Sequence, residues 1–332
     1  MNVKALVRTV NHTLKSHNLF PENSRILVAC SGGPDSMALL YLLQDIAIHR
    51  HTTYELGVAI VDHCIRPESK EEVLWLQHQV KSLGLPFYST TFDVPRLSKE
   101  QKQSEETIGR QVRYQWLTEL AQSENYDYIA VAHHKDDQAE SILAHIIRGS
   151  GLNGLTGMSV VHSEYSIPVV RPLLDVTKEN VLAYLSAKHI SYCIDSTNEN
   201  VQYQRNRIRH RIIPELEAIN PNVVDAIVRL GNSVHEDLLV ISDLTEQAFE
   251  KLVTIGADGV SLSRRALRQE SLSIQCRLWQ RLVSTVDSDI TLTSAHQEQL
   301  LDIVKSGEEK TFTIKSIKVT VQCDTIKVYC KH

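Results

Sequence analysis

The sequence predicts an α/β fold, in which a doubly wound, mainly parallel sheet precedes a smaller helical or α+β C-terminal region. Between residues 25 and 171, short apolar runs alternate with helical patterns, and this alternation is typical of parallel strands joined by helices. A length of 332 residues is enough for about two or three domains. Beyond residue 195 the alternation stops, and helical patterns followed by strand-like alternation take its place.

The alternating region begins with a predicted helix, because apolar side chains recur at helical spacing over residues 3–14, and we expect this stripe to pack on the sheet. The stripe consists of Val3, Leu6, Val7, Val10 and Leu14. Apolar runs predict strands over residues 25–30, 56–61, 87–92, 128–132 and 167–170. Helical patterns between them cover residues 37–43, 71–83, 107–121 and 137–148. In the helix over 71–83, the residues expected to face inward are Val73, Leu74, Leu76 and Val80.

The C-terminal part has a different pattern. Residues 205–253 predict helices, residues 262–284 predict one further helix, and residues 310–328 alternate as strands do. An Asn-Pro step at Asn220-Pro221 interrupts the helical pattern and favours a boundary there. We therefore expect a first domain over residues 1–218 and a second region over residues 219–332.

Composition and charge exclude several classes of protein. The net charge is -5 and the sequence pI is near 6.3, so any nucleic-acid surface must be local. No apolar run reaches the roughly 18 residues of a membrane span, and the first twenty residues lack the features of a secretion signal. The six cysteines form no C-x-x-C pair, which favours reduced thiols and a cytoplasmic protein.

The first predicted strand runs directly into Ser31-Gly-Gly-Pro-Asp-Ser36, which has the pattern of a phosphate-binding turn. Its two glycines allow the backbone to close tightly, and the N–H groups of the turn and of the following helix then point at an anion. Its two serines add hydroxyl donors. The carboxylate of Asp35 would repel bare phosphate, which suggests that Mg2+ is bound with the anion. An ordinary strand-to-helix turn would need neither the serines nor the aspartate.

Two further polar clusters follow strand ends. Asp62-His63 follows the second predicted strand, and His133-His-Lys-Asp-Asp137 follows the fourth. Because ligands bind at the carboxyl ends of parallel strands, all three clusters are expected to converge on one rim. Asp136 or Asp137 and Glu140 would lie on one helical face, close enough to share a metal or to position a nucleophile. Acids that complement the helix dipole are the alternative for one aspartate, and zinc is disfavoured because neither H-E-x-x-H nor paired cysteines occur.

Two other patterns lie near this rim. Residues 149–154 match the dinucleotide fingerprint G-x-G-x-x-G, but they follow a helix rather than a strand, so we interpret them as a flexible loop near the site. The run from residue 205 to 211 places Arg205 and Arg209 on one helical face and Arg207 and Arg211 on another. Arginine forks suit phosphate, so one face is expected to hold ATP or substrate and the other a nucleic-acid backbone. A solvated charged helix is the alternative.

With the S-G-G-x-D-S signature at Ser31–Ser36, the sequence resembles the PP-loop ATP pyrophosphatases, and more narrowly it is similar to the tRNA(Ile)-lysidine synthetase family. The narrower resemblance covers residues 24–215. It is carried by Val61-Asp-His63-x-x-Arg66-Pro-Glu-Ser69, Glu106-x-x-x-Arg110-x-x-Arg113-Tyr114, His133-His-x-Asp136-Asp-Gln-Ala-Glu140, Arg148-Gly-Ser-Gly-Leu-Asn-Gly-Leu155, Gly157-Met158, Arg171-Pro172-Leu173, Asp195-x-Thr197-Asn198 and Arg205-Asn206-Arg-x-Arg209-His210.

This resemblance implies a PP-loop ATPase fold of the adenine nucleotide alpha hydrolase type and a two-step ligase reaction. ATP binds the turn, and the C2 carbonyl oxygen of a wobble cytidine attacks its α-phosphate and releases pyrophosphate. The ε-amine of free L-lysine then attacks C2 and expels AMP, which leaves lysidine in the CAU-anticodon isoleucine tRNA. The implied cofactors are ATP and Mg2+, and residues 219–332 are implied to bind tRNA. The oligomeric state stays open, with a homodimer as one option.

The resemblance also implies roles for individual residues. Catalytic roles are assigned to Asp35, Asp136, Asp137, Glu140, Arg113 and Arg205. Nucleotide binding is assigned to Ser31, Gly32, Gly33, Pro34, Asp35, Ser36, Asp62 and His63, and Mg2+ binding to Asp35 and Asp137. Substrate or tRNA binding is assigned to His133, Arg110, Asn206, Arg207, Arg209 and Arg211. In physical terms, the acids of the 136–140 segment would orient and deprotonate the lysine ammonium, and Arg113 and Arg205 would balance negative charge.

Some features depart from the family pattern. Ser141 replaces a threonine and keeps the hydroxyl, and Gly109 replaces a common alanine. The chain also ends soon after one small C-terminal region, whereas longer members carry a further subdomain.

Two other functions compete with lysidine synthesis. A PP-loop enzyme that thiolates tRNA cytidine generally needs paired cysteines, and a non-catalytic, ATP-responsive RNA-binding module would not need the acids around the turn.

Overall fold

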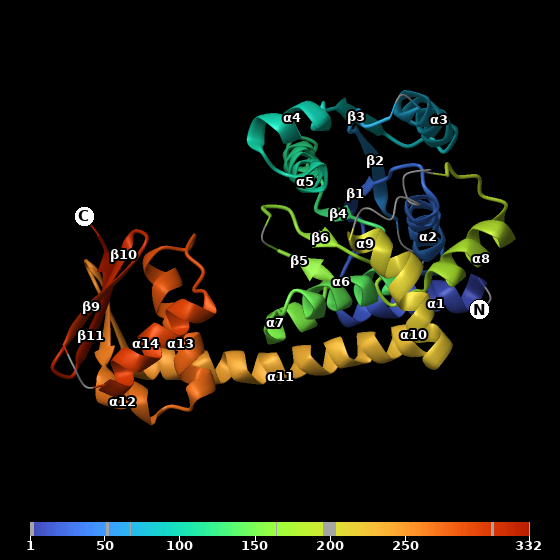
Figure 1. Cartoon of the computed structure of the whole chain (residues 1–332). Coiled ribbons are helices and arrows are strands. Elements are labelled where there is room, and N and C mark those ends of the chain that lie inside the picture. The colour runs from blue at the N-terminus through green and yellow to red at the C-terminus, as the bar shows by residue number, and fades with distance from the viewer. Residues whose placement is uncertain are drawn as a thin grey trace. The chain divides into compact units, whose positions relative to one another are not determined.

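The computed structural model describes residues 3–50, 53–66, 68–163, 165–194, 204–306 and 309–331 (Figure 1). The motif Asp195-x-Thr197-Asn198 lies outside these residues. The chain divides into two compact units, residues 1–232 and 233–332, and each contains one sheet. Across the described ranges, no helix combines the length and the apolar composition that crossing a bilayer requires.

A six-stranded sheet forms the centre of the first unit, with the strand order β3-β2-β1-β4-β6-β5. Its strands are β1 (Arg25–Ala29), β2 (Glu55–Asp62), β3 (Phe87–Thr91), β4 (Tyr128–Ala130), β5 (Val161–His162) and β6 (Val169–Val170). Neighbouring strands are parallel except for β5 and β6. The winding reverses at β1, because β2 and β3 lie on one side of it and β4 on the other. In a doubly wound sheet, such a reversal is where ligands bind.

Helices cover both faces of this sheet (Figure 1). They are α1 (Val3–Ser16), α2 (Pro34–Arg50), α3 (Ser69–Ser82), α4 (Val94–Gln101), α5 (Glu105–Ser123), α6 (Lys135–Ile147), α7 (Leu152–Leu155) and α8 (Lys178–Lys188). Successive residues of a strand face opposite sides. Ile26 and Val28 of β1 share a core with α1, α2 and α8, whereas Leu27 shares a second core with α5. The predicted doubly wound, mainly parallel sheet is therefore confirmed.

The segment from residue 204 to 252 is helical, as its sequence pattern predicts. It consists of α9 (Gln204–Arg207), a π-helical turn η2 (Ile208–Ile212), α10 (Ile213–Ile219) and α11 (Val223–Leu252). The Asn-Pro step at 220–221 does end α10. The two compact units, however, divide after Asn232, inside α11. The reason is that the first turns of α11 pack on the first unit, where a Cβ added to Gly231 would meet Ile142.

The second unit contains a five-stranded antiparallel sheet in the order β7-β8-β11-β10-β9. Its strands are β7 (Val253–Gly256), β8 (Gly259–Ser263), β9 (Lys310–Ile314), β10 (Ile317–Gln322) and β11 (Thr325–Cys330). Its other helices are α12 (Arg264–Gln269), α13 (Leu272–Val286) and α14 (Ser294–Ser306). One apolar core, which includes the fully buried Leu278 and Trp279, joins α13 and α14 to the sheet.

The prediction of a single helix over 262–284 is wrong, because two serines divide this segment. Val260 and Leu262 belong to β8, where they pair with Val328 and Ile326. The Ser263 hydroxyl then accepts the N–H of Ala266 and starts α12, and the Ser271 hydroxyl accepts the N–H of Ile274 and starts α13.

One smaller expectation in the first unit differs from the structure. In α3, Leu76 and Val80 are buried, but Leu74 is 64% exposed and does not face the core. The N-terminal stripe is buried as expected, in a core that α1 shares with β1, α2 and α8.

Candidate functional site

The phosphate-binding turn joins β1 to α2 at the carboxyl end of the strand. Gly32 has a φ of 79°, a left-handed conformation that favours glycine. The Ser36 hydroxyl donates to the Gly33 carbonyl at 2.9 Å and accepts the Ser31 N–H at 3.2 Å, so the turn is already closed on itself. The first N–H groups of α2 have no partners within the helix. This arrangement can hold a phosphate group.

The segment that follows α8 returns to this turn. The Cys193 N–H donates to the Gly32 carbonyl at 2.9 Å. A Cβ added to Gly32 would lie 3.6 Å from Cys193 Sγ and from the ring of Trp75, so both side chains pack on the glycine. Neither contact was predicted, because Cys193 and Trp75 lie outside the motifs of the sequence.

Asp35 makes an ion pair with a lysine that the sequence analysis did not single out. Lys178 Nζ lies 2.6 Å and 2.7 Å from the two carboxylate oxygens of Asp35. The backbone N–H of Lys178 donates to Asp136 Oδ2 at 2.8 Å. Lys178 is the first residue of α8, so its position joins the start of α8 to both α2 and α6. Both carboxylate oxygens of Asp35 therefore already contact a cationic group.

Asp137 and Glu140 lie side by side on α6, as predicted, and both are buried. Two arginines bind them together. Arg205 donates from Nη2 to Asp137 and from Nε to Glu140, at 2.9 Å in each case. Arg209 Nη2 lies 2.9 Å from Asp137 Oδ1, and its Nε lies 2.5 Å from Glu140 Oε1. Arg205 and Arg209 therefore do share one helical face, and that face binds carboxylates.

The charges of this cluster stabilise each other. Burial would raise the pKa of Asp137, but His134 and Arg205 lower it to about 2. Burial would lower the pKa of Arg205, but Asp137 and Glu140 raise it. Asp137 is therefore ionised at neutral pH, and a carboxylate with so low a pKa is a weak base.

His134 lies between the acids of α2 and α6. Its Nε2 lies 3.8 Å from Asp35 Oδ1 and 3.4 Å from Asp137 Oδ2, and its Nδ1 lies 3.4 Å from Asp136 Oδ2. The backbone N–H of His134 also donates to Asp137 Oδ2 at 3.0 Å, which caps α6. Burial alone would lower the pKa of His134, but the three aspartates raise it. The His134 imidazole, which also accepts the Asp137 N–H at 3.4 Å, therefore connects the turn to the carboxylates.

Two other predicted residues, His133 and His63, are half-buried and neutral. Burial lowers the pKa of His133 to about 3 and, together with the positive charge of Arg113, lowers that of His63 to about 4. In each ring the Nδ1 atom is buried and has no hydrogen-bond partner among the described residues. Asp62, next to His63, accepts the Cys64 N–H at 2.9 Å. These polar groups lie at the rim, at the carboxyl ends of β2 and β4.

The predicted arginines of α5 stack on an aromatic pair. Arg110 and Arg113 lie 4.8 Å and 5.5 Å from the ring centre of Tyr114, which itself stacks on Tyr165 at 5.3 Å. Burial lowers the pKa of Arg113, and the neighbouring Arg110 and Arg205 lower it further. A Cβ at Gly109, where the family has alanine, would make only ordinary contacts of 3.8 Å with His63. This departure leaves the position of the arginines unaffected.

The remaining predicted substrate residues, Asn206, Arg207 and Arg211, lie in α9 and η2. Arg207 and Arg211 are exposed, and Asn206 is half-buried. Asn206 has interactions of its own and is not a free side chain. The structure therefore separates the arginine run into a pair that binds carboxylates and a pair that faces solvent, as its spacing predicts.

Sequence reasoning missed Lys178 and gave no individual role to His134 and Arg171, although both lie in motifs quoted for the resemblance. Arg171 follows β6 at the same rim and is only 3% exposed. The signal for Arg171 was available, because a charged residue directly after a buried strand is unusual. His134 and Lys178 gave weaker signals, since each also occupies an ordinary position at a helix start.

A glutamine of α6 shapes the loop beside the site. The Gln138 side chain accepts the Met158 N–H at 2.6 Å and donates to the Met158 carbonyl at 2.9 Å. Gly157, the residue before Met158, has a φ of 67°, and a Cβ there would lie 2.6 Å from Gln138 Oε1. The segment 149–154, predicted as a loop, contains the short helix α7, and a Cβ at Gly154 would lie 2.5 Å from His145 Nδ1.

The carboxylates at the rim supply part of the donor set that Mg2+ requires. Within the described ranges, no three His, Cys, Asp or Glu side chains are grouped so as to hold a metal ion by themselves. Mg2+ usually takes one or two carboxylates and completes its shell with water and substrate phosphates. Asp35 and Asp137, which flank the same edge of His134, fit such a site.

Comparison with known proteins gives a consistent picture. A family model described as a PP-loop domain matches residues 3–216. A curated protein of Porphyromonas gingivalis named tRNA(Ile)-lysidine synthase is 36% identical over 244 residues, which are 73% of this chain and 52% of that protein. A Bacillus cereus protein of the same name is 31% identical over 304 residues, 90% of this chain and 63% of that protein. The chain thus spans between half and two thirds of these relatives.

One solved structure is similar in fold. The U34-tRNA thiolase NcsA from Methanococcus maripaludis, solved with its [4Fe-4S] cluster, has a TM-score of 0.60 and 19% sequence identity. The similarity covers 70% of this chain and 80% of that one. At this level of identity, the comparison supports the fold of the sheet and not the chemistry.

Proposed function

We propose that this chain, which belongs to the PP-loop family through residues 3–216, ligates lysine to the wobble cytidine of a tRNA at the cost of ATP. Membership of the family implies ATP use. The proposed product is lysidine in the CAU-anticodon isoleucine tRNA, and the by-products are AMP and pyrophosphate. One observation carries the proposal: a phosphate-binding turn and a buried carboxylate–arginine cluster are linked at one rim by His134. The relatives named tRNA(Ile)-lysidine synthase support it.

In the first step, the turn at Ser31–Ser36 would hold the phosphates of ATP through its N–H groups and hydroxyls. The C2 carbonyl oxygen of the cytidine attacks the α-phosphate, and the bond between the α- and β-phosphates breaks. Lys178, now paired with Asp35, lies where it can balance the charge of the pyrophosphate. Mg2+ held by Asp35 and Asp137 would neutralise phosphate charge as well.

In the second step, Asp137 and Glu140 would receive the ammonium group of lysine. Both carboxylates accept hydrogen bonds from Arg205 and Arg209, whose side chains are 38% and 33% exposed and can swing toward solvent. The low pKa of Asp137 suits a residue that binds and orients the ammonium rather than one that removes its proton. Glu140 would take that proton, after which the amine bonds to C2 and the bond from C2 to the adenylate oxygen breaks, so that AMP leaves. The freed guanidinium groups would then face the adenylate and the RNA backbone.

The target cytidine lies in an anticodon loop, where a single-stranded base is turned into a pocket at low cost. We propose that residues 219–332 bind another part of the tRNA. We also place the reaction in the cytoplasm, where the six free cysteines stay reduced.

A thiolase activity is the second candidate, because NcsA shares the fold. It is disfavoured by the positions of the cysteines, which are all free and which are not grouped with other metal ligands in the described ranges. A non-catalytic ATP-responsive module is disfavoured by the buried acids, since an unreactive nucleotide pocket has no use for charges that are costly to bury.

The test is a transfer assay with labelled lysine, ATP, Mg2+ and a tRNA transcript that carries the CAU anticodon. We expect label in the RNA and equimolar AMP. A transcript whose wobble base is changed to guanosine should accept no label. Pyrophosphate release without lysine transfer would leave only ATP use and would contradict the proposed ligation. Label from a sulfur donor in place of lysine would support the thiolase reading.

A further inference from the structure

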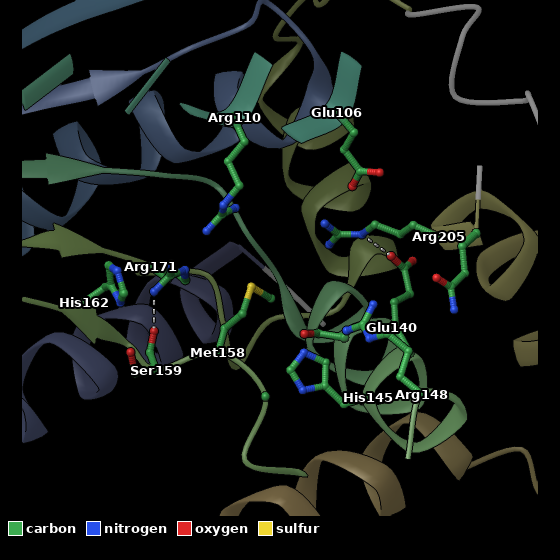
Figure 2. A pocket seen from close by; sticks show the side chains of 14 residues that line it. Glu106, Arg110, Glu140, His145, Arg148, Met158, Ser159, His162, Arg171 and Arg205 are labelled. Carbon is green, nitrogen blue, oxygen red and sulfur yellow. Dashed lines mark hydrogen bonds and ion pairs between the residues drawn. The ribbon is translucent and has the colours of Figure 1, made fainter. Parts of the chain in front are cut away.

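A second pocket lies beyond the carboxylate cluster in the first unit (Figure 2). It has a volume of about 400 Å³, which is within the range of small-ligand sites. Side chains from α5, α6, α9 and the segment before β6 point into it. No residue of the phosphate-binding turn lines the pocket, so it is distinct from the proposed seat of the ATP phosphates.

Positive charge dominates the lining. Four arginines and two glutamates line the pocket: Arg110, Arg148, Arg171, Arg205, Glu106 and Glu140. Glu140 is already bound to Arg205 and Arg209. Among the described residues, neither Arg110 nor Arg148 nor Arg171 makes an ion pair with a carboxylate. The pocket therefore contains three guanidinium groups without an ion-pair partner in the described part of the chain, and its four arginines outnumber its two glutamates.

Arg171 gives the strongest evidence that the pocket binds an anion. Its side chain is almost fully buried, and Nη1 donates to the Ser159 carbonyl at 2.7 Å, as Figure 2 shows. Its Nε atom is buried and has no hydrogen-bond partner among the described residues, and the same is true of His145 Nδ1 in the same lining. Burial lowers the pKa of Arg171, and nearby Arg110 lowers it further. A buried cation that lacks a carboxylate is costly, and a bound anion would offset that cost.

The chemistry of the lining identifies the kind of anion. Arginine forks match the oxygens of a phosphate group, and Ser159 and Ser141 add hydroxyls. None of the described residues that line the pocket is a phenylalanine, tyrosine or tryptophan, and its four arginines outnumber its two imidazole rings, His145 and His162. The lining thus suits a phosphodiester better than a nucleobase. Glu140 and Arg205 belong both to this pocket and to the proposed lysine site, so the phosphate would lie next to the reacting nucleotide.

We propose that this arginine pocket binds a backbone phosphate of the RNA strand beside the target cytidine and thereby fixes the position of that nucleotide at the carboxylate cluster. The inference rests on the proposed function in that it takes RNA as the substrate. Free pyrophosphate also presents phosphate oxygens to the arginines. The experiment must therefore distinguish pyrophosphate from RNA as the ligand of the pocket.

Two exposed arginines of the pocket allow a test without disturbing the core. Binding of a fluorescent anticodon stem-loop RNA with the CAU sequence is measured by anisotropy at several salt concentrations, with the parent chain, Arg148→Gln and Arg110→Gln. Arg8→Gln, an exposed residue of α1 outside the pocket, is the control with the same charge change. Each phosphate contact contributes roughly 0.7 to the slope of log K against log salt for a single strand.

We expect each pocket variant to bind RNA about 5-fold more weakly at 0.1 M salt and to lower the slope by roughly 0.7, whereas Arg8→Gln leaves both unchanged. A parent chain that binds no RNA would contradict the proposed function itself. If the parent binds RNA and the pocket variants match Arg8→Gln, the pocket proposal is wrong. Loss of pyrophosphate binding with unchanged RNA binding would also overturn it, because the pocket would then be a product site.

Discussion

The two sheets of this molecule bury different kinds of side chain. In the first unit the buried polar residues include Asp62, His134, Asp137, Glu140 and Arg171, all of which can carry charge. In the described part of the second unit the buried polar residues are Thr245 and Gln275, which cannot. Because an unpaired buried charge is costly, a fold retains such residues where they have a task. The contrast locates the chemistry at the rim of the parallel sheet and leaves the antiparallel sheet to apolar packing.

Replacing Glu140 with glutamine is expected to have the largest effect on that rim. The amide keeps the shape but loses the charge that holds Arg205 and Arg209, and a misplaced lysine amine is expected to slow transfer by at least about 100-fold. Pyrophosphate release should fall less, because the first step is proposed to use Asp137 of this cluster through Mg2+ but not Glu140. Both rates are measured with the CAU transcript. Glu119→Gln, an exposed acid of α5, is the control and should change neither rate. Equal loss of both steps would show that Glu140 does not serve lysine in particular.

The second unit should respond to a change of packing alone. Leu278→Ala removes a fully buried side chain from its core, and we expect a loss of about 3 kcal/mol in the free energy of unfolding. Leu272→Ala on the same helix is the control, because that side chain is 56% exposed and should cost less than about 0.5 kcal/mol. Urea unfolding is followed by Trp279 fluorescence in a Trp75→Phe, Trp116→Phe background. An altered ATP affinity in Leu278→Ala would contradict the conclusion that the chemistry lies in the first unit and that the second unit contributes apolar packing alone.

The same contrast explains what the sequence could predict. Strand and helix positions in the first unit followed from apolar runs, because a parallel strand is covered on both faces and needs no polar alternation. In the second unit, β8 was missed, because Leu262 also fits the helical stripe that continues through Ala266 and Leu267. Such a short alternation is ambiguous until its partner strand is known.

The candidate site was predictable where chemistry is local in the sequence. The turn at Ser31–Ser36 and the acids on α6 were found from spacing alone. Contacts across the chain could not be found in this way. The pairing of Asp35 with Lys178 joins residues 143 positions apart, and no periodicity encodes it. The same holds for the two arginines at Glu140, whose role as carboxylate partners depends on the tertiary placement of α9 and η2.

The loop beside the rim offers a matched pair of glycines. Gly157 and Gly149 both have positive φ, so alanine at either costs about 1 to 2 kcal/mol in backbone strain. A Cβ at Gly149 meets open space, whereas one at Gly157 would also push Gln138 away from Met158. We therefore expect Gly157→Ala to lose about 1 kcal/mol more than Gly149→Ala. Urea unfolding monitored through Trp75 and Trp116 measures the difference, and equal losses would show that the Gln138 clamp contributes nothing.

The smallest expected effect concerns the acid stability of the first unit. The pKa of Asp137 falls from 3.8 to about 2 on folding, so its contribution to stability is complete above the unfolded pKa and is lost as the pH falls through the folded one. The shift corresponds to about 2 kcal/mol in total, of which about 1 kcal/mol should disappear between pH 5 and pH 3. In Asp137→Asn this part of the pH dependence should be absent, while the exposed control Asp243→Asn should keep it. Unfolding midpoints in urea at the two pH values give the comparison. If Asp137→Asn loses as much stability as the parent between pH 5 and pH 3, the buried acids of the rim are not held in their charged form by His134 and Arg205.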